Sequence, residues 1–285
     1  METINEQYLR PRLLLRANDS HKGDYGHLLV VAGCQTMPGA AVLAAGAALH
    51  SGCGLVTLHS TERALQAVVN SFPSAILSED PGCCLSRIPD SQGKYSAIAV
   101  GPGLGQRPET LAALKELLST AKSLHKPMIL DADALNLIAD HPDLWESVPE
   151  GSVLTPHLGE LRRLLSCETD EEKDAAVRRL CRETGCTLVM KGYHTRVYTP
   201  DGYILENTTG NPGLAKGGSG DDVIPRSLKD DEGISDFTDF CTETLAQIYA
   251  DQGYPEQARQ IYSRLSLRFP EKSAYFAALI EKLKK

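Results

Sequence analysis

The sequence contains no long hydrophobic run. No stretch reaches the roughly 18 to 20 apolar residues that span a bilayer. The first residues, METINEQYLRPRLLLRAND, show neither the apolar region nor the small-residue cleavage site of a signal peptide. The 8 cysteines form no CxxC pair, so we interpret them as reduced thiols and not as disulfide or zinc ligands. We therefore expect a cytoplasmic protein.

Positive charge is also scarce. The chain carries 29 Lys and Arg against 37 Asp and Glu, a formal net charge of -8. This balance argues against sequence-independent binding to nucleic acids or anionic membranes, because both need a cationic face. There is no Walker A G-K-[ST] and no dinucleotide fingerprint followed by an acidic residue. These absences argue against an ordinary P-loop kinase and a Rossmann dehydrogenase.

Short β-rich runs alternate with helical stretches from about Gly26 onward, which is typical of a mostly parallel sheet covered by helices. VYTPDGYILEN predicts a hairpin, since Pro-Asp-Gly favours a turn. In the helix expected from about Glu109, four apolar residues share one face: Leu111, Leu114, Leu118 and Ala121. The expected strands are HLLVVAG (27–33), LVTLH (55–59) and AIAVGPGLG (97–105). PMILDADALN (127–136) begins a further strand that ends on acidic residues, and GSVLTPHLGE (151–160) and CTLVMKG (186–192) are expected strand-to-loop transitions.

The composition changes after Asp222. We predict an N-terminal lead over 1–20, an α/β domain over 21–222, a polar linker over 223–237 and a helical tail over 238–285. The tail spacing is typical of a tetratricopeptide repeat. The residues in this pattern are Leu245, Ala246, Tyr249, Gly253, Ala258, Tyr262, Leu265 and Pro270, with a further helix expected over 272–284. A single repeat cannot bury its own apolar face, so the tail needs a neighbour.

The clearest chemical signal is NTTGNPGLAKGGSGD, residues 207–221. Its glycines leave backbone N–H groups free to converge on an anion. A carboxylate directly after such a cradle suits phosphoryl transfer, in which the amides stabilise the moving phosphate and Asp221 accepts a proton from the attacking hydroxyl. The alternative is a flexible glycine loop that ends in an aspartate.

The motifs HKGDYGHLLVVAG with GAAVLAA, GPGLG, LDADALN, LTPHLGE, MKGYHT and GGSGD occur in the order found in ADP-dependent NAD(P)H-hydrate dehydratases. The chain resembles this family over about two hundred residues. The resemblance implies a ribokinase-like three-layer α/β/α fold with a mostly parallel sheet. It also implies repair of hydrated NADH or NADPH, with ADP (or ATP) phosphorylating the ring hydroxyl and phosphate then leaving. Mg²⁺ is expected as a cofactor.

The resemblance also implies roles for individual positions. Asp221 matches the catalytic base and also contacts the substrate, while Gly220 contacts the nucleotide phosphate. The substrate is expected at Ala41, Gly103 and His157. The adenine nucleotide is expected at Lys191, Gly192, Tyr193, His194 and Thr195. Asp133 and Asn136 match site walls with an indirect role in magnesium placement, and no direct metal ligand is assigned.

Each position also has a structural interpretation. The glycines of GPGLG are common in a turn after a strand. His157 fits a structural hydrogen-bonding role, and Lys191 fits the end of a strand. Asp131 and Asp133 are able to hold a loop through side-chain to backbone bonds. Ligands in open α/β sheets bind beyond the carboxyl ends of the strands, and the joint placement of these loops there favours the functional interpretation.

The chain departs from the family in three ways. Only about twenty residues precede HKG, so no epimerase domain is expected. Lys216 replaces a small hydroxylic residue. In the family, GGSGD leads into an apolar helix and further closing helices, whereas here SLKDDEG offers no apolar face. Without these helices, no helix dipole would stabilise the phosphate, and apolar surface over the sheet is expected to be exposed.

Two other functions remain open. One is an inactive nucleotide-binding remnant, or an interaction module that contacts a protein through its tail. The other is a ribokinase-like small-molecule kinase, whose product would keep the phosphate that a dehydratase releases. The expected partners are hydrated NADH or NADPH and an adenine nucleotide, without nucleic acid or membrane, and a homo-oligomer is compatible with the resemblance.

Overall fold

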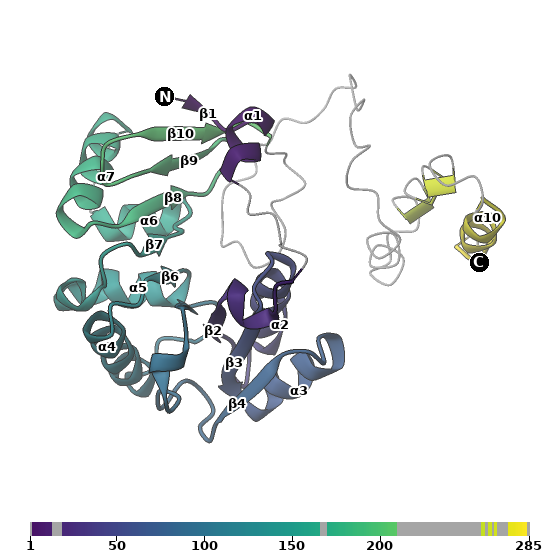
Figure 1. Ribbon diagram of the computed structural model, residues 1–285, viewed down its shortest axis with the longest axis horizontal. Helices are drawn as coiled ribbons and strands as arrows, with labels where there is room; N and C mark the ends of the chain where they lie inside the picture. The colour runs from purple at the N-terminus through teal and green to yellow at the C-terminus, as the bar shows by residue number, and fades with distance from the viewer. Residues whose placement is uncertain are drawn as a thin grey trace. The chain divides into compact units, whose positions relative to one another are not determined.

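The computed structural model describes residues 2–12, 19–165, 170–209, 258–259, 262–263, 265–266 and 273–283. Contacts between Cα atoms divide the chain into two units, residues 1–222 and 223–285. The first unit is an open, mostly parallel α/β sheet with helices on its faces (Figure 1). This arrangement confirms the predicted fold class.

The described strands and helices alternate along most of the chain. The strands are β1 (Glu2–Thr3), β2 (His27–Val31), β3 (Leu55–Thr61), β4 (Ile76–Asp80), β5 (Ala97–Val100), β6 (Met128–Leu130), β7 (Val153–Leu154), β8 (Thr187–Met190), β9 (Thr195–Tyr198) and β10 (Ile204–Asn207). The α-helices are α1 (Glu6–Leu9), α2 (Pro38–His50), α3 (Glu62–Ser71), α4 (Pro108–Ser123), α5 (Asp133–Asp140), α6 (Leu158–Leu165), α7 (Asp170–Thr184) and α10 (Ser273–Lys282).

The strands form one sheet in the order β1-β10-β9-β8-β7-β6-β5-β2-β3-β4. The pairs from β8 to β4 are parallel, and β9 and β10 form the predicted antiparallel hairpin. The carboxyl ends of β2 to β8 therefore lie along one edge. The chain moves outward from β2 through β3 to β4, then returns to β5 on the other side of β2. Open α/β sheets bind ligands at such a switch point.

Alternating side chains of the strands divide the core into two layers. On β2, Leu29 and Val31 pack with residues of α4 to α7, while Val30 and the following Ala32 pack with α2 and α3. This alternation follows from the period of two along a strand. Figure 1 shows α4 to α7 on one side of the sheet and α2 and α3 on the other. The sheet thereby holds the loops at its carboxyl edge on a packed base.

A buried polar cluster lies under the loop after β4. The Asp80 carboxylate accepts bonds from the backbone N–H groups of Gly82, Ser86 and Arg87 and from the Ser86 hydroxyl. Burial alone would raise the pKa of Asp80, but these bonds outweigh it and hold the pKa below its ordinary value. His59 Nε2 lies 3.6 Å from Asp80 Oδ2 and 3.0 Å from the Arg87 carbonyl oxygen. Burial lowers the pKa of His59.

This cluster predicts a loss of stability on mild acidification. Because the folded pKa of His59 lies below its unfolded value of 6.5, the unfolded chain binds more protons as the pH falls through that value. The free energy of unfolding should therefore decrease between about pH 7 and pH 5. Urea denaturation across this range should show a weaker pH dependence for His59→Gln, and an unchanged slope would contradict the prediction. The bonds to Asp80 act in the same direction, but only at lower pH.

The second unit is described over a few short segments. Ala258, Tyr262, Leu265 and Phe276 form a small buried cluster. The predicted final helix is present as α10. The other residues of the predicted repeat lie outside the described segments, so the repeat stays a prediction. None of the described helices is long and apolar enough to cross a membrane.

Candidate active site

Two glycine loops meet at the switch point between β2 and β5. The Gly33 N–H donates to the Pro102 carbonyl oxygen at 2.7 Å, which joins the loops. Gly101 and Gly103 have φ angles of 134° and 66°, in the range that favours glycine. A Cβ on Gly101 would lie 1.7 Å from the Asp131 carbonyl oxygen. The loop after β5 therefore needs glycine to lie this close to the end of β6.

The predicted substrate positions Ala41 and Gly103 both flank this switch point. Ala41 is completely buried on α2 and would lie 2.8 Å from a Cβ added to Gly33. Gly103 approaches the start of the same helix, where an added Cβ would lie 2.6 Å from Ala40 Cβ. The small residues of α2 thus allow the helix to lie against both glycine loops.

The loop after β6 contains a strained residue between two aspartates. Ala132 has φ 47° and ψ -119°, an unusual conformation for a residue with a side chain. Asp133 accepts a bond from the Gly105 N–H at 2.9 Å and one from the Gln106 side chain at 3.2 Å. Asp133 therefore holds the glycine loop, as its structural interpretation proposed.

Asp131, directly after β6, forms an ion pair with Lys191, which directly follows β8. Lys191 Nζ lies 2.6 Å from Asp131 Oδ1, and the two side chains are 43% and 28% exposed. The Lys191 N–H donates to the Pro156 carbonyl oxygen, and Lys191 pairs with His157 in a parallel bridge. The ion pair thus joins the loops after β6 and β8 while leaving the ammonium group partly in solvent.

The predicted nucleotide segment continues from Lys191 along the same edge. Gly192, Tyr193 and His194 are exposed. Tyr193 is 60% exposed and contacts the His194 ring edge-to-face at 4.8 Å between centroids. Thr195 begins β9 and donates its hydroxyl to the Gly192 carbonyl oxygen at 3.2 Å. An exposed aromatic ring two residues after a lysine suits a ligand that carries both a flat ring and negative charge.

His157 caps α6. Its Nδ1 accepts the N–H groups of Gly159 at 3.0 Å and Glu160 at 3.3 Å, and its own N–H donates to Glu160 Oε2 at 2.9 Å. This is the reciprocal arrangement of a capping box. Since Nδ1 accepts these bonds, the ring proton belongs on Nε2, which lies 3.5 Å from Glu160 Oε1. His157 has the structural role that was left open, and its side chain stays 20% exposed.

Sequence reasoning missed several partners in this row of loops. Neither the pairing of Asp131 with Lys191 nor the capping role of Glu160 was predicted. The H-L-G-E spacing is a signal that could have found the cap, because an acidic residue three positions after a capping residue is typical. Asn136 accepts a 2.6 Å bond from Arg163. The predicted residues Gly220 and Asp221 lie outside the described residues.

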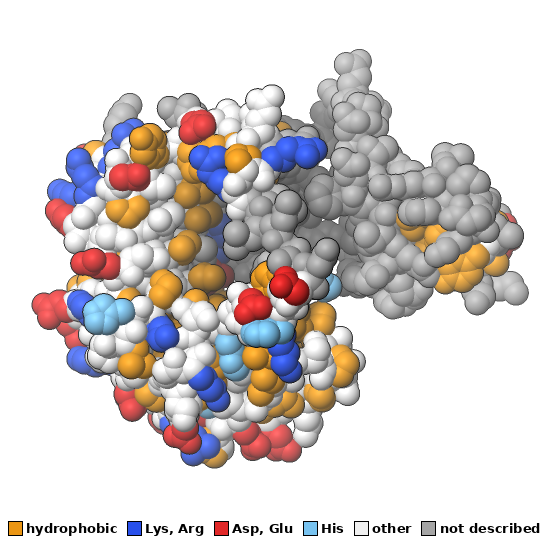
Figure 2. Space-filling model, viewed as in Figure 1, with side chains coloured by type: hydrophobic (Ala, Val, Ile, Leu, Met, Phe, Trp, Pro, Cys, Tyr) orange, Lys and Arg blue, Asp and Glu red, His pale blue; other side chains and the backbone are white. Residues whose placement is uncertain are grey.

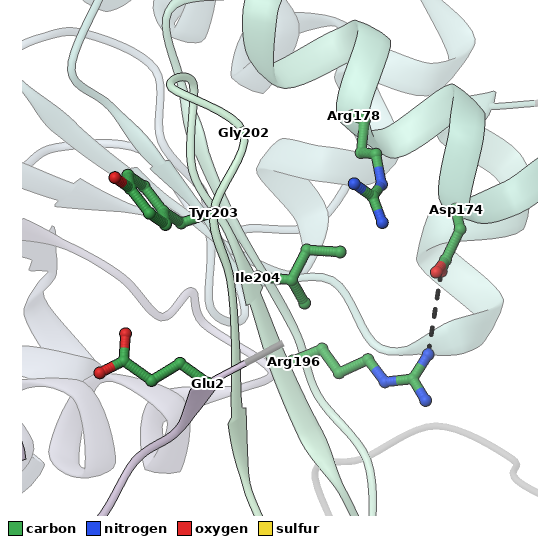
Figure 3. A pocket seen from close by; sticks show the side chains of 7 residues that line it. All are labelled: Glu2, Asp174, Arg178, Arg196, Gly202, Tyr203 and Ile204. Atoms are coloured by element: carbon green, nitrogen blue, oxygen red, sulfur yellow. Dashed lines mark ion pairs between the residues drawn. The ribbon is translucent and has the colours of Figure 1, made fainter.

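A hollow of about 500 Å³ lies elsewhere, between α7 and the outer strands (Figure 3). It is lined by Glu2, Asp174, Arg178, Arg196, Gly202, Tyr203 and Ile204. In Figure 3 the side chains of Tyr203 and Glu2 extend away from the two arginines. Arg196 is paired with Glu206 at 3.2 Å and with Asp174 at 3.9 Å. None of the predicted site residues lines this hollow.

The described side chains do not form a preformed magnesium site. They contain no cluster of three His, Cys, Asp or Glu residues able to hold a metal ion. Asp131, Asp133 and Glu160 already accept bonds from protein groups. Mg²⁺ in nucleotide sites is often held by one or two carboxylates together with substrate phosphates. These residues alone do not fit a metal cage, and we derive no step through one.

The fold and the row of loops at its carboxyl edge define a ribokinase-like α/β protein with a candidate ligand site. A ribokinase-like superfamily protein from Enterococcus faecalis has a similar structure, with a TM-score of 0.66 and 25% identity over 76% of this chain and 75% of that chain. The ADP/ATP-dependent NAD(P)H-hydrate dehydratase of Bacillus subtilis, co-crystallised with ATP/Mg²⁺, gives a TM-score of 0.65 and 34% identity over 77% of this chain and 76% of that chain.

The family model described as NAD(P)H-hydrate dehydratase matches residues 28–224. The chain belongs to this family. The ADP-dependent (S)-NAD(P)H-hydrate dehydratase of Neisseria meningitidis is 39% identical over 72% of this chain and 69% of its own length. A bifunctional NAD(P)H-hydrate repair enzyme from Moorella thermoacetica is 36% identical over 76% of this chain. The chain spans only 43% of that bifunctional relative.

Proposed function

We propose that the chain is an ADP-dependent dehydratase that restores NADH or NADPH from their hydrated forms. The observation that supports the proposal is the row of loops at the carboxyl edge of the sheet. In this row Lys191, at the end of β8, is partly exposed and joined to the loop after β6, which in turn contacts the glycine loop after β5. From the end of β5 to the end of β8 this row covers about 14 Å at the usual strand spacing. A nucleotide and a second ligand therefore have room side by side.

The proposed reaction has two steps. The ring hydroxyl of the hydrated substrate attacks the terminal phosphoryl group of ADP, and its proton passes to Asp221, so that AMP leaves. The ring C–O bond then breaks, phosphate departs with the bonding electrons, and a proton leaves the neighbouring carbon to form the ring double bond. ATP would serve in the same way. The net products are the reduced dinucleotide, phosphate and the shortened nucleotide.

We assign the protein groups as follows. The backbone N–H groups before Asp221, with Gly220 beside the phosphate, would stabilise the transferring phosphoryl group. Lys191 to Thr195 would bind the adenine nucleotide. Ala41, Gly103 and His157 would bound the substrate, with Ala41 acting beneath the loop because its side chain is buried. The Nε2–H of His157 is the ring group that would donate to a ligand oxygen, because Nδ1 already accepts two backbone N–H groups.

The proposal is tested by product analysis. Purified chain with hydrated NADH, ADP and Mg²⁺ should produce NADH and free phosphate in equal amounts. A stable phosphorylated product without NADH would instead indicate a small-molecule kinase. Binding of ADP without either product would indicate an inactive remnant. Either result would reject the proposed function.

Lys191→Met should weaken ADP binding by about tenfold to a hundredfold, since hydrogen bonds to charged groups contribute about 1.5 to 3 kcal/mol. Isothermal titration calorimetry measures the change. Lys115→Met is the matched control, because Lys115 forms a comparable 3.0 Å ion pair with Asp143 on the helical layer. An equal loss of affinity in both variants would contradict the role of Lys191.

A further inference from the structure

Among the described residues, helices cover one face of the sheet over only part of its width. On the face that carries α2 and α3, the registers connect Val30 of β2 through Ala99 and Ile129 to Val153 of β7, which pairs with Thr187 of β8. Two residues further along β8, on the same face, Val189 pairs with Val197 of β9, which pairs with Leu205 of β10. We call this set the open face. Its residues are Ala99, Ile129, Val153, Val189, Val197 and Leu205. All six are apolar and lie on one face of the sheet, where the polar Thr187 interrupts the row between Val153 and Val189.

The open face is only partly shielded. Ile129 is 40% exposed although β6 lies inside the sheet between β5 and β7. The other five residues are partly exposed, whereas Leu130, Leu154 and Leu188 on the opposite face are completely buried. Parallel sheets are normally covered on both faces. Figure 2 shows hydrophobic side chains gathered over β8, β7 and β6.

The neighbouring helix layer shows what covers this face. Where the face continues under β2 and β3, helices α2 and α3 pack on it. On α2, Leu43 is 71% exposed and Ala40 and Ala44 are partly exposed. From β5 to β10 the open face is about 24 Å wide at the usual strand spacing, which is room for two or three helices at 8 to 10 Å.

We propose that a separate helical polypeptide docks on the open face and completes the domain. The family match ends at Ile224, and the structural match covers 76% of the Bacillus subtilis dehydratase, so about a quarter of that chain lies outside the match. The sequence directly after Asp222, VIPRSLKDDEG, lacks the apolar periodicity of a sheet-packing helix. Further along, the apolar tail residues Ala258, Tyr262, Leu265 and Phe276 already pack against one another. The partner should carry two or three helices with Ala, Leu and Val on one side and polar residues on the other.

The test uses the full chain and one defined probe. The probe is the part of the Bacillus subtilis dehydratase that lies outside its match to this chain. Light scattering should show a one-to-one complex, and fluorescence of a dye that binds apolar surface should fall as the complex forms. Binding is the readout, so the result is independent of whether the chain is an active dehydratase.

Variants distinguish the open face from other exposed apolar surface. Ile129→Asp should weaken the complex about tenfold or more, because a charge would be buried without a partner. Ile76→Asp is the matched control: Ile76 is also a strand isoleucine, 43% exposed, but lies on β4 at the far edge of the sheet. Its complex should be unchanged. Val189→Thr is a milder variant on the open face, for use if Ile129→Asp does not fold, and should also weaken binding.

Three results would overturn the proposal. The first is that the folded parent chain forms no complex with the probe in excess. Ile129→Asp and Ile76→Asp could weaken the complex equally, which would place the contact elsewhere. The chain could form a dimer that Ile129→Asp dissociates, which would assign the open face to a second copy.

Discussion

Asp221→Asn should reduce the rate of NADH regeneration by about 10² to 10⁴, the usual contribution of a general base. Asparagine keeps the shape of the side chain but cannot accept the proton of the attacking hydroxyl. The backbone amides before it remain, so ADP binding should persist. Absorbance of the reduced nicotinamide measures the rate, and a thermal shift with ADP measures binding.

The adjacent residue provides the control for this substitution. Asp222→Asn makes the same chemical change one position later, outside the G-S-G-D motif. It should retain most of the parent activity. Equal rates in Asp221→Asn and the parent would remove the catalytic base from the proposed reaction. Equal losses in both variants would indicate a general effect of the loop charge.

Gly101→Ala should lower the free energy of unfolding by about 3 kcal/mol or more, the range of strained or overpacked positions. The added Cβ would lie 1.7 Å from a backbone oxygen, that of Asp131, which has no rotamer to move away. The φ of 134° is unfavourable for alanine as well. The loop after β5 would separate from β6, so ADP binding should weaken together with stability. Urea denaturation measures the first effect.

Gly105→Ala separates backbone strain from the steric clash. Gly105 lies in the same loop with φ 74°, but a Cβ there would meet nothing within 4 Å. Its substitution should cost only about 1 to 2 kcal/mol, the left-handed penalty alone. Similar losses at the two positions would show that the close approach to Asp131 does not constrain the loop.

The strand pattern could be predicted where the strands are apolar. Buried runs such as HLLVV and the Pro-Asp-Gly turn match β2 and the β9–β10 hairpin closely. β4 was missed because its ILSED sequence ends in charged residues, and only the surrounding N–H groups explain the burial of Asp80. β1 is two residues long and pairs with a strand some two hundred residues later, so no local pattern reveals it.

Helix α4 shows the limit of a periodicity argument. Of its predicted face, Leu114, Leu118 and Ala121 are completely buried, but Leu111 is only partly buried. Leu117 is completely buried as well, because the helix packs over a broader surface than one i, i+3, i+7 row predicts.

The sequence could predict which loops form the candidate site, but not which side chains in them bond to one another. Strand ends and glycines correctly placed Gly103, His157 and Lys191 along one edge. Which group Lys191 meets depends on the order of β6, β7 and β8, and the sequence pattern does not give strand order directly. The same holds for the contact between α2 and the loop of Gly103, which needs the packed helix layer.

The central claim is that the glycine loop and the described edge form one nucleotide site. The most direct test is a crystal structure of the full chain with ADP. We expect the adenine beside Tyr193, Lys191 near the phosphates, and the Gly217 to Asp221 loop around the terminal phosphate. A nucleotide bound in the hollow near Arg178, or a Gly217 to Asp221 loop far from Lys191 and His157, would contradict the claim.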